Sequence, residues 1–86
     1  MKYVKKPVEI EAFQLGVDCA PSWFMNKIGE ELKLEFNDSG DIRSVDIKTL
    51  EGTMTAYVGD FIIQGVKGEL YPCRADIFYE TYRAVE

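Results

Sequence analysis

The sequence predicts a small α+β domain, in which a strongly curved, mainly antiparallel sheet of about five or six strands is accompanied by two helices. First, 86 residues suit a single domain spanning residues 1–86 with one core. Second, apolar residues alternate with polar ones between glycine-containing turns, whereas helical spacing occurs in only two segments. The predicted order is β-α-β-β-β-β-β-α, and hairpin connections between successive strands imply antiparallel pairing.

The N-terminal segment from Tyr3 to Leu15 predicts a strand. Val8, Ile10 and Ala12 alternate with acidic residues, so we expect these three side chains to be buried and the acids to be exposed. Pro7 has no N–H to donate and places the first half of this strand near an edge.

A helix is predicted to begin at Pro21, because the first helical turn accepts a residue without an N–H. Apolar residues then recur at helical spacing: Trp23, Phe24, Ile28 and Leu32. Gly29 either permits close packing or weakens the middle of this helix.

The middle of the chain predicts two strands joined by a turn. Leu34–Phe36 is a short strand, and residues 37–41 are the richest in turn-forming types. Ile42, Val45 and Ile47 continue into the next strand, where the step from 42 to 45 breaks the alternation and indicates a bulge.

The last two-fifths of the chain predict two further hairpin turns. Glu51-Gly52 closes one turn before a strand at residues 53–58, and Gly59-Asp60 closes the next. The continuous apolar run at residues 61–63 is typical of a central strand covered on both faces. Gly65 to Gly68 is the strongest hairpin candidate, because glycine adopts positive φ at little cost.

The chain is then predicted to end in a strand and a helix. Residues 69–73 form a strand that either ends or lies on an edge at Pro72, since a proline cannot donate to a ladder. Residues 74–82 form a helix that caps the sheet, with Ile77, Phe78 and Tyr82 on one face and Asp76 near the positive end of the helix dipole.

The charge of the chain is unevenly distributed. The net charge is −5, with +3 on residues 1–8 from Lys2, Lys5 and Lys6, and −6 on residues 9–41. A negative total disfavours sequence-independent binding to nucleic acid. The acids of the second segment form either a solvated face or a surface for a basic partner: Glu9, Glu11, Glu30, Glu31, Glu35, Asp38 and Asp41.

The sequence predicts a cytoplasmic protein without a membrane segment. No apolar run approaches the roughly 20 residues that a spanning helix needs, and no signal-type apolar region follows the basic N-terminus. Cys19 and Cys73 are too few and too far apart for a disulfide framework or a metal half-site. We expect both to be free thiols, and a buried structural role is favoured over a reactive one.

No catalytic constellation is apparent, so the sequence predicts a non-enzymatic protein without cofactor or metal. There is no histidine, and the only paired carboxylates that the pattern suggests are Asp60 and Glu69, across the hairpin at residues 65–68. A turn aspartate that binds its own backbone explains Asp60 equally well. The glycines do not match a nucleotide-binding fingerprint, and residues 37–41 lack the glutamate of an EF-hand.

An anion site of another kind is the candidate that remains. Lys67 at a hairpin tip and Arg74 at a helix start could converge on a phosphate together with free backbone N–H groups. Aromatic residues could stack on a base, although most aromatics of so small a domain belong to the core: Trp23, Tyr57, Tyr71 and Tyr79.

Three segments, VKKPVEIEAFQL, PSWF and GDFIIQGVKGELYPCRADIFYETY, resemble a family of small, mostly uncharacterised proteins encoded by phages and prophages. The resemblance covers nearly the whole chain. Many members have Lys-Pro where this chain has Arg74-Ala75, and Phe61 replaces the usual tyrosine, which puts any role of that hydroxyl in doubt.

The resemblance implies a setting rather than a mechanism. It suggests a phage accessory protein that antagonises host immunity, either by sequestering a nucleotide-type immune signal as a homo-oligomer or by covering a host defence protein with an acidic, DNA-mimic-like face. An enzyme that degrades the signal is a third hypothesis. The first is favoured, with Lys67, Arg74, Tyr71, Trp23 and Tyr57 as ligand-binding residues in the host bacterial cytoplasm.

Overall fold

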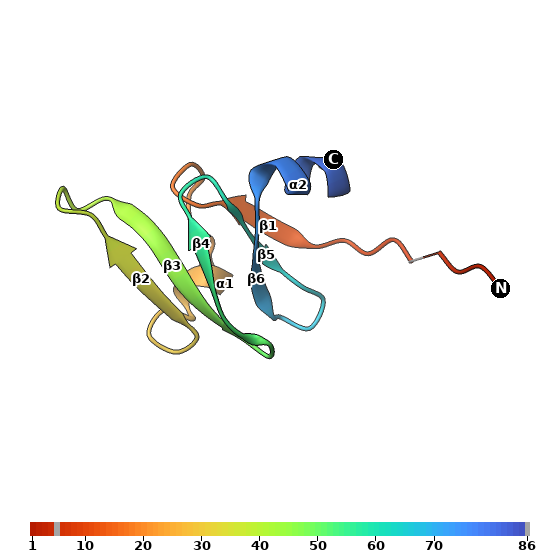
Figure 1. Cartoon of the computed structure of the whole chain (residues 1–86), viewed down its shortest axis with the longest axis horizontal. Coiled ribbons are helices and arrows are strands. Elements are labelled where there is room, and N and C mark those ends of the chain that lie inside the picture. The colour runs from red at the N-terminus through yellow and green to blue at the C-terminus, as the bar shows by residue number, and fades with distance from the viewer. Residues whose placement is uncertain (5, 86) are drawn as a thin grey trace.

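The computed structural model describes residues 1–4 and 6–85, and it has the predicted α+β fold and element order. The elements are β1 (Glu11–Gln14), α1 (Ser22–Met25), β2 (Leu32–Phe36), β3 (Ile42–Thr49), β4 (Gly52–Tyr57), β5 (Phe61–Gln64), β6 (Leu70–Cys73) and α2 (Ala75–Thr81). They form one body, from which the N-terminal segment runs outward (Figure 1).

The strands divide into two open antiparallel sheets of three strands each, where one curved sheet was predicted. Sheet A has the order β1-β5-β6 and sheet B the order β2-β3-β4. The chain changes sheet at the turn of Gly59 and Asp60, where β4 ends in sheet B and β5 begins in sheet A. Gly59 has a φ of 98°, which favours glycine at this corner.

The core lies where the two sheets and α1 meet. Its largest fully buried members are Val45, Ile47 and Ile62, and β6 lies against both β3 and β4. The rest of the cluster consists of Phe13, Leu15, Phe24, Leu32, Ala56 and Leu70. Burying this set supplies the main favourable term for folding, at about 25 cal/mol for each Å² of apolar surface removed from water.

Sheet A is covered on its outer face as well, as the apolar run at residues 61–63 predicted. Ile62 faces the core, whereas Phe61 lies under α2, with its ring stacked on that of Phe78 at a centroid distance of 3.8 Å. β5 is the central strand of its sheet and β6 an edge strand, so both assignments are confirmed.

The turns of the structure also follow the sequence. The Asn37 side chain accepts hydrogen bonds from the backbone N–H groups of Ser39 and Asp41, which closes the turn between β2 and β3. The predicted bulge is real, because Glu35 pairs with Ser44 while Phe36 pairs with Ile42, which leaves Arg43 as the extra residue of β3. The hairpin between β5 and β6 closes through hydrogen bonds at Gly65 and Gly68.

The first helix and the N-terminal strand are both shorter in the structure than predicted. The first helix ends at Met25, and Leu32, assigned to it because of its spacing, begins β2. Gly29, with a φ of 91°, turns the chain between the two. At the N-terminus only residues 11–14 form a strand, and Val8 is exposed; Lys5 lies outside the described residues.

The buried side of β1 also differs from the prediction. Phe13 and Leu15 enter the core, while Ile10 and Ala12 are only half-buried on the other side. Phe78 of α2 and Tyr82, which directly follows the helix, are half-buried as expected, but Ile77 of α2 is exposed.

Candidate functional site

An open cleft of about 840 Å³ lies between two hairpin ends, and we call it the hairpin cleft. One wall is formed by residues 48–51 at the end of the β3–β4 hairpin, and the other by residues 67–72 of the β5–β6 turn and β6. Lys27, Glu31 and Met54 complete its lining. Its volume is within the range of about 300 to 1,000 Å³ that is usual for small-molecule sites.

Lys27 fixes the position of the β5–β6 hairpin. Its ammonium group donates to the carbonyl oxygen of Gly68 at 3.0 Å and forms an ion pair with Glu31 at 2.9 Å. These contacts join the segment before β2 to the tip that carries Lys67. The hairpin therefore rests on the other half of the molecule, and the cleft has a defined shape.

Two further lysines of the cleft have no acidic partner. Among the described residues, ion pairs join only Lys27 to Glu31 and Arg74 to Asp76. Lys48 and Lys67 are exposed side chains on opposite walls of the cleft. In the described part of the chain Glu69 forms no ion pair with Lys67, and its carboxylate accepts the backbone N–H of that residue at 3.0 Å.

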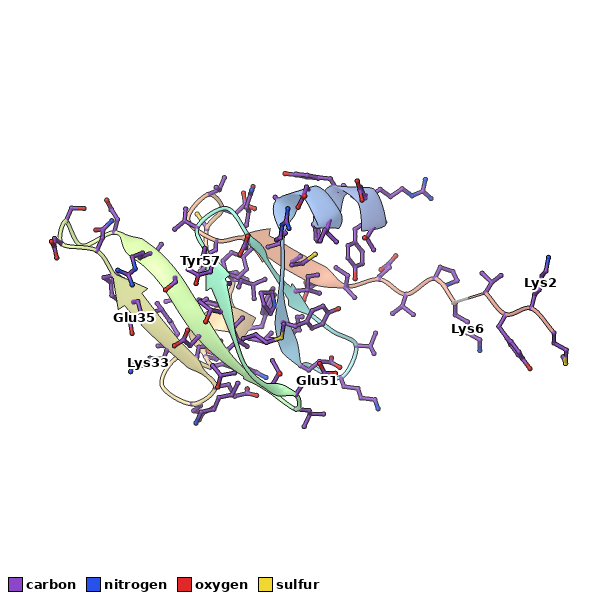
Figure 2. All side chains as sticks on the ribbon, viewed as in Figure 1. Lys2, Lys6, Lys33, Glu35, Glu51 and Tyr57 are labelled. Carbon is purple, nitrogen blue, oxygen red and sulfur yellow. The ribbon has the colours of Figure 1, made fainter. Side chains whose placement is uncertain are left out.

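The remaining acid of the cleft is Glu51, at the end of the β3–β4 hairpin (Figure 2). No ion pair engages it within residues 1–4 and 6–85. An anion that binds between the lysines would have to lie away from this carboxylate and from that of Glu69 on the other wall.

Tyr71 borders the β6 wall and also a second depression on the outer face of sheet A. Burial and the neighbouring Tyr82 side chain raise the pKa of its phenol to about 12. The Tyr71 hydroxyl therefore remains protonated near neutral pH, where it can donate a hydrogen bond but cannot serve as a base.

The second depression is a groove rich in aromatic residues, and we call it the aromatic groove. It runs between the N-terminal segment at residues 6–10 and the C-terminal segment at residues 81–85, over Phe61, Tyr71 and α2. The rings pack on one another: the ring centroids of Phe78 and Tyr82 are 5.0 Å apart, and Tyr79 meets Phe61 edge-on with centroids 5.5 Å apart. Lys6 and Arg83 supply its cations.

The five predicted ligand-binding residues do not form one site. Lys67 and Tyr71 line the hairpin cleft together. Arg74 is the N-cap residue of α2 and follows the four residues of β6, a strand about 13 Å long, so it lies at the end of β6 that is opposite to the turn with Lys67. Its guanidinium group pairs with the Asp76 carboxylate at 2.8 Å.

The other two predicted residues are separate from both clefts. Trp23 is half-buried and packs against the core beside Phe13, with ring centroids 5.7 Å apart. Tyr57 is an exposed side chain near the far end of β4 (Figure 2).

The structure does not bring the candidate acid–base pair together. In the β5–β6 register Phe61 pairs with Cys73, which places Asp60 at one end of the hairpin and Glu69 at the other. The expectation of a paired geometry was wrong for that reason. The Asp60 carboxylate accepts the backbone N–H of Tyr57 at 2.9 Å, as the turn interpretation predicted.

The two cysteines are free, and neither is fully buried, contrary to the structural role that was favoured. Cys19 is exposed and Cys73 is half-buried. Burial, with smaller contributions from Asp60 and Asp76, raises the pKa of the Cys73 thiol, which lowers its thiolate fraction near neutral pH.

The described part of the chain lacks a metal-binding cluster and a membrane-spanning helix. No three histidine, cysteine, aspartate or glutamate side chains gather there in a way that could hold a metal ion. No helix formed by those residues is long and apolar enough to cross a membrane.

No local pattern singles out Lys27 and Lys48. Lys48 occupies an outward position in β3, and Lys27 lay within the wrongly extended helix. Only the folding of the two hairpins toward the same cleft places them near Lys67, and that depends on contacts between the sheets.

The acidic residues considered as a surface are also divided. Glu35 lies on β2 beside Lys33 (Figure 2), and Asp38 and Asp41 belong to the turn that follows. Glu11 is in β1 of the other sheet, where it pairs with Gln64. The sequence total of −6 for residues 9–41 is therefore spread over both sheets.

Comparisons with known proteins give no match to this chain: no family model, no curated protein and no solved structure is similar to it.

Proposed function

We propose that the protein binds a nucleotide-type ligand without transforming it, and that the hairpin cleft is the binding site. The observation that carries the proposal is the presence of Lys48 and Lys67, neither engaged in an ion pair of the described residues, on a cleft that is also bordered by Tyr71. Lysines are suited to phosphate groups, and the face of a tyrosine ring is suited to a base.

The resemblance to phage-encoded proteins supplies the biological setting of this proposal. A protein that holds a nucleotide immune signal and returns it unchanged would act as an antagonist of host defence in the bacterial cytoplasm. One open cleft exposes much of a dinucleotide to water, so we include a homo-oligomer in the proposal, in which a second copy helps to enclose the ligand.

The experiment is a binding assay with a panel of cyclic mono- and dinucleotides, using thermal shift and then calorimetry. Lys67→Ala should weaken binding about 10- to 100-fold, because a hydrogen bond to a charged group contributes about 1.5 to 3 kcal/mol. Lys33→Ala is the matched control, since Lys33 is an exposed lysine of β2 that lines neither cleft. Equal effects of the two substitutions would contradict the proposed site.

The same preparation separates the competing functions. A ligand recovered intact after heat denaturation of the complex supports sequestration, whereas a chemically altered ligand would indicate an enzyme. Absence of any thermal shift together with stoichiometric binding to a host defence protein would favour direct inhibition through acidic residues.

A further inference from the structure

Residues 1–4 and 6–10 belong to an arm that leaves the body of the molecule (Figure 1). Among residues 1–4 and 6–10, no backbone N–H or C=O group takes part in a hydrogen bond. Apolar side chains of this arm are exposed, with Val4 at 93% and Val8 at 52%. Lys2 and Lys6 lie along it, beyond the sheets (Figure 2).

The arm continues directly into β1, and β1 is an edge strand of sheet A. The orientation of the free edge follows from Leu15, whose N–H donates to Asp60 and whose C=O accepts from Gly59, both on the β5 side. Backbone groups alternate along a strand, so those of even-numbered residues point away from β5. Gln14 agrees, because its N–H donates to the Asp18 carboxylate at 3.0 Å outside the sheet.

This alternation leaves a defined edge open. The outward groups of Gln14 are occupied, because its C=O also accepts from Val17 and Asp18. If the arm extended β1 as a strand, its outward groups would be those at even positions from Val4 to Ala12, and Val4, Lys6, Val8 and Ile10 form no backbone hydrogen bond that would compete. Pro7 does not interrupt this edge, since its position is odd and a proline N–H would point the other way.

We propose that the arm and β1 pair antiparallel with the same segment of a second copy, so that two molecules form one six-stranded sheet; the described residues that take part are Val4 and residues 6–12. A second copy fits because the charges are complementary: in the sequence, residues 1–8 carry +3, and Glu9 and Glu11, which follow directly, carry −2. Each basic arm would lie against the start of the acidic region of its partner.

Charge also selects the register. With Ile10 opposite Ile10, Glu9 of each chain would face Glu11 of the other, which places like charges directly opposite. With Val8 opposite Val8, Glu9 faces Pro7, and Val4 faces Ala12 at the last open position. The register centred on Val8 is therefore the one we assign.

The pairing follows from the edge of sheet A and needs no nucleotide, and it lies away from the hairpin cleft, because β5 separates β1 from β6. The two-fold axis of such a pair is perpendicular to the sheet, so both α2 helices would cover the same face. The two aromatic grooves would then become neighbours, because residues 6–10 form one side of each.

Disulfide trapping tests the register. In a Cys19→Ser, Cys73→Ala background, Val8→Cys should give a covalent dimer under oxidising conditions, because opposed Cα atoms of a hydrogen-bonded pair lie about 5.5 Å apart. Ile10→Cys is the matched control and should remain monomeric, because its two copies would be about 13 Å apart along the strands. A covalent dimer of the Ile10→Cys variant only, or no covalent dimer of either variant, would overturn the assigned pairing.

Light scattering of the protein in solution tests the pairing itself. Wild-type protein should have twice the 9.8 kDa mass of one chain. Val8→Pro removes an outward N–H at the centre of the interface and should halve the mass, whereas Glu9→Pro removes an inward one and should retain the dimer. A monomeric wild type, or equal effects of the two prolines, would refute the inference. Neither outcome would bear on whether one chain binds a nucleotide.

Discussion

Attachment of α2 to sheet A can be tested through the stacked rings of Phe61 and Phe78. The seven residues of α2 include no buried side chain, and so short a helix is not stable alone in water. The two rings are nearly parallel, with centroids 3.8 Å apart and planes at 4°, so their stack is an apolar contact between the helix and sheet A, beside the edge-on contact of Tyr79 with Phe61. We expect the pair to be energetically coupled.

A double-mutant cycle of Phe61→Leu and Phe78→Leu measures this coupling in the free energy of unfolding. Leucine retains apolar bulk, so the interaction energy isolates the ring contact, which is about 0.5 to 1.5 kcal/mol for aromatic pairs. With an m-value of about 1 kcal/mol/M in urea, the double mutant should depart from additivity by about 0.5 to 1.5 M in its midpoint.

Urea titrations followed by the fluorescence of Trp23, the single tryptophan, provide the assay. Trp23 packs against the core beside Phe13, so it reports unfolding of the body rather than release of α2. A cycle of Phe61→Leu with Ile77→Ala is the control, since Ile77 lies on the same helix without a ring. Additive costs for the Phe61 and Phe78 substitutions would refute the view that the stack holds α2.

Two further outcomes are expected from the environments of Tyr71 and Gly16. The folded state keeps the pKa of Tyr71 at about 12 against 10.0 for a free phenol, so ionisation favours the unfolded chain. Stability should therefore be unaffected by this group below pH 10 and should fall between pH 10 and 12, and Tyr71→Phe should reduce that fall in urea midpoints measured across the range. Gly16→Ala should cost at least about 1 to 2 kcal/mol, because its φ is 79° and an added Cβ would lie 2.8 Å from a valine methyl of the β4–β5 turn. Gly65→Ala is its control: only the movable carboxylate of Glu69 lies in the way, so thermal or urea denaturation should show a smaller loss. Equal losses for both glycines would contradict this explanation.

The parts of the fold that were predictable depend on neighbours in sequence. A run of three apolar residues at 61–63 is buried on both faces of its sheet, and the glycines at 65 and 68 close the hairpin after it. In each case the local backbone preference and the final packing agree, so the pattern alone identified the element.

The errors occurred where a local pattern fitted two structures. Leu32 is four residues from Ile28, which is helical spacing, yet Gly29 turns the chain and Leu32 enters the core from β2. Val8 and Ile10 alternate as in a strand, but the buried positions are Phe13 and Leu15, which meet the core only because β1 pairs with β5. Contacts between distant segments decided these cases.

The candidate site was only half predictable for the same reason. Lys67 and Tyr71 are four residues apart around one hairpin, so sequence alone could place them together. Arg74 is only three residues after Tyr71, but β6 separates it from the turn with Lys67, and its guanidinium group pairs with Asp76. Lys48 reaches the cleft from a different sheet, and no local pattern indicates that meeting.

The two proposals together identify which depression holds the ligand. The hairpin cleft lies along β6, which is separated from the β1 edge by β5, so breaking the arm interface should not change its side chains. The aromatic groove is bordered by residues 6–10 and would lose its neighbour in a monomer. Nucleotide affinity that survives Val8→Pro but falls with Lys67→Ala therefore belongs to the hairpin cleft. Affinity that falls with Val8→Pro and is indifferent to Lys67→Ala instead belongs to the aromatic groove, with Lys6 and Arg83 as its cations.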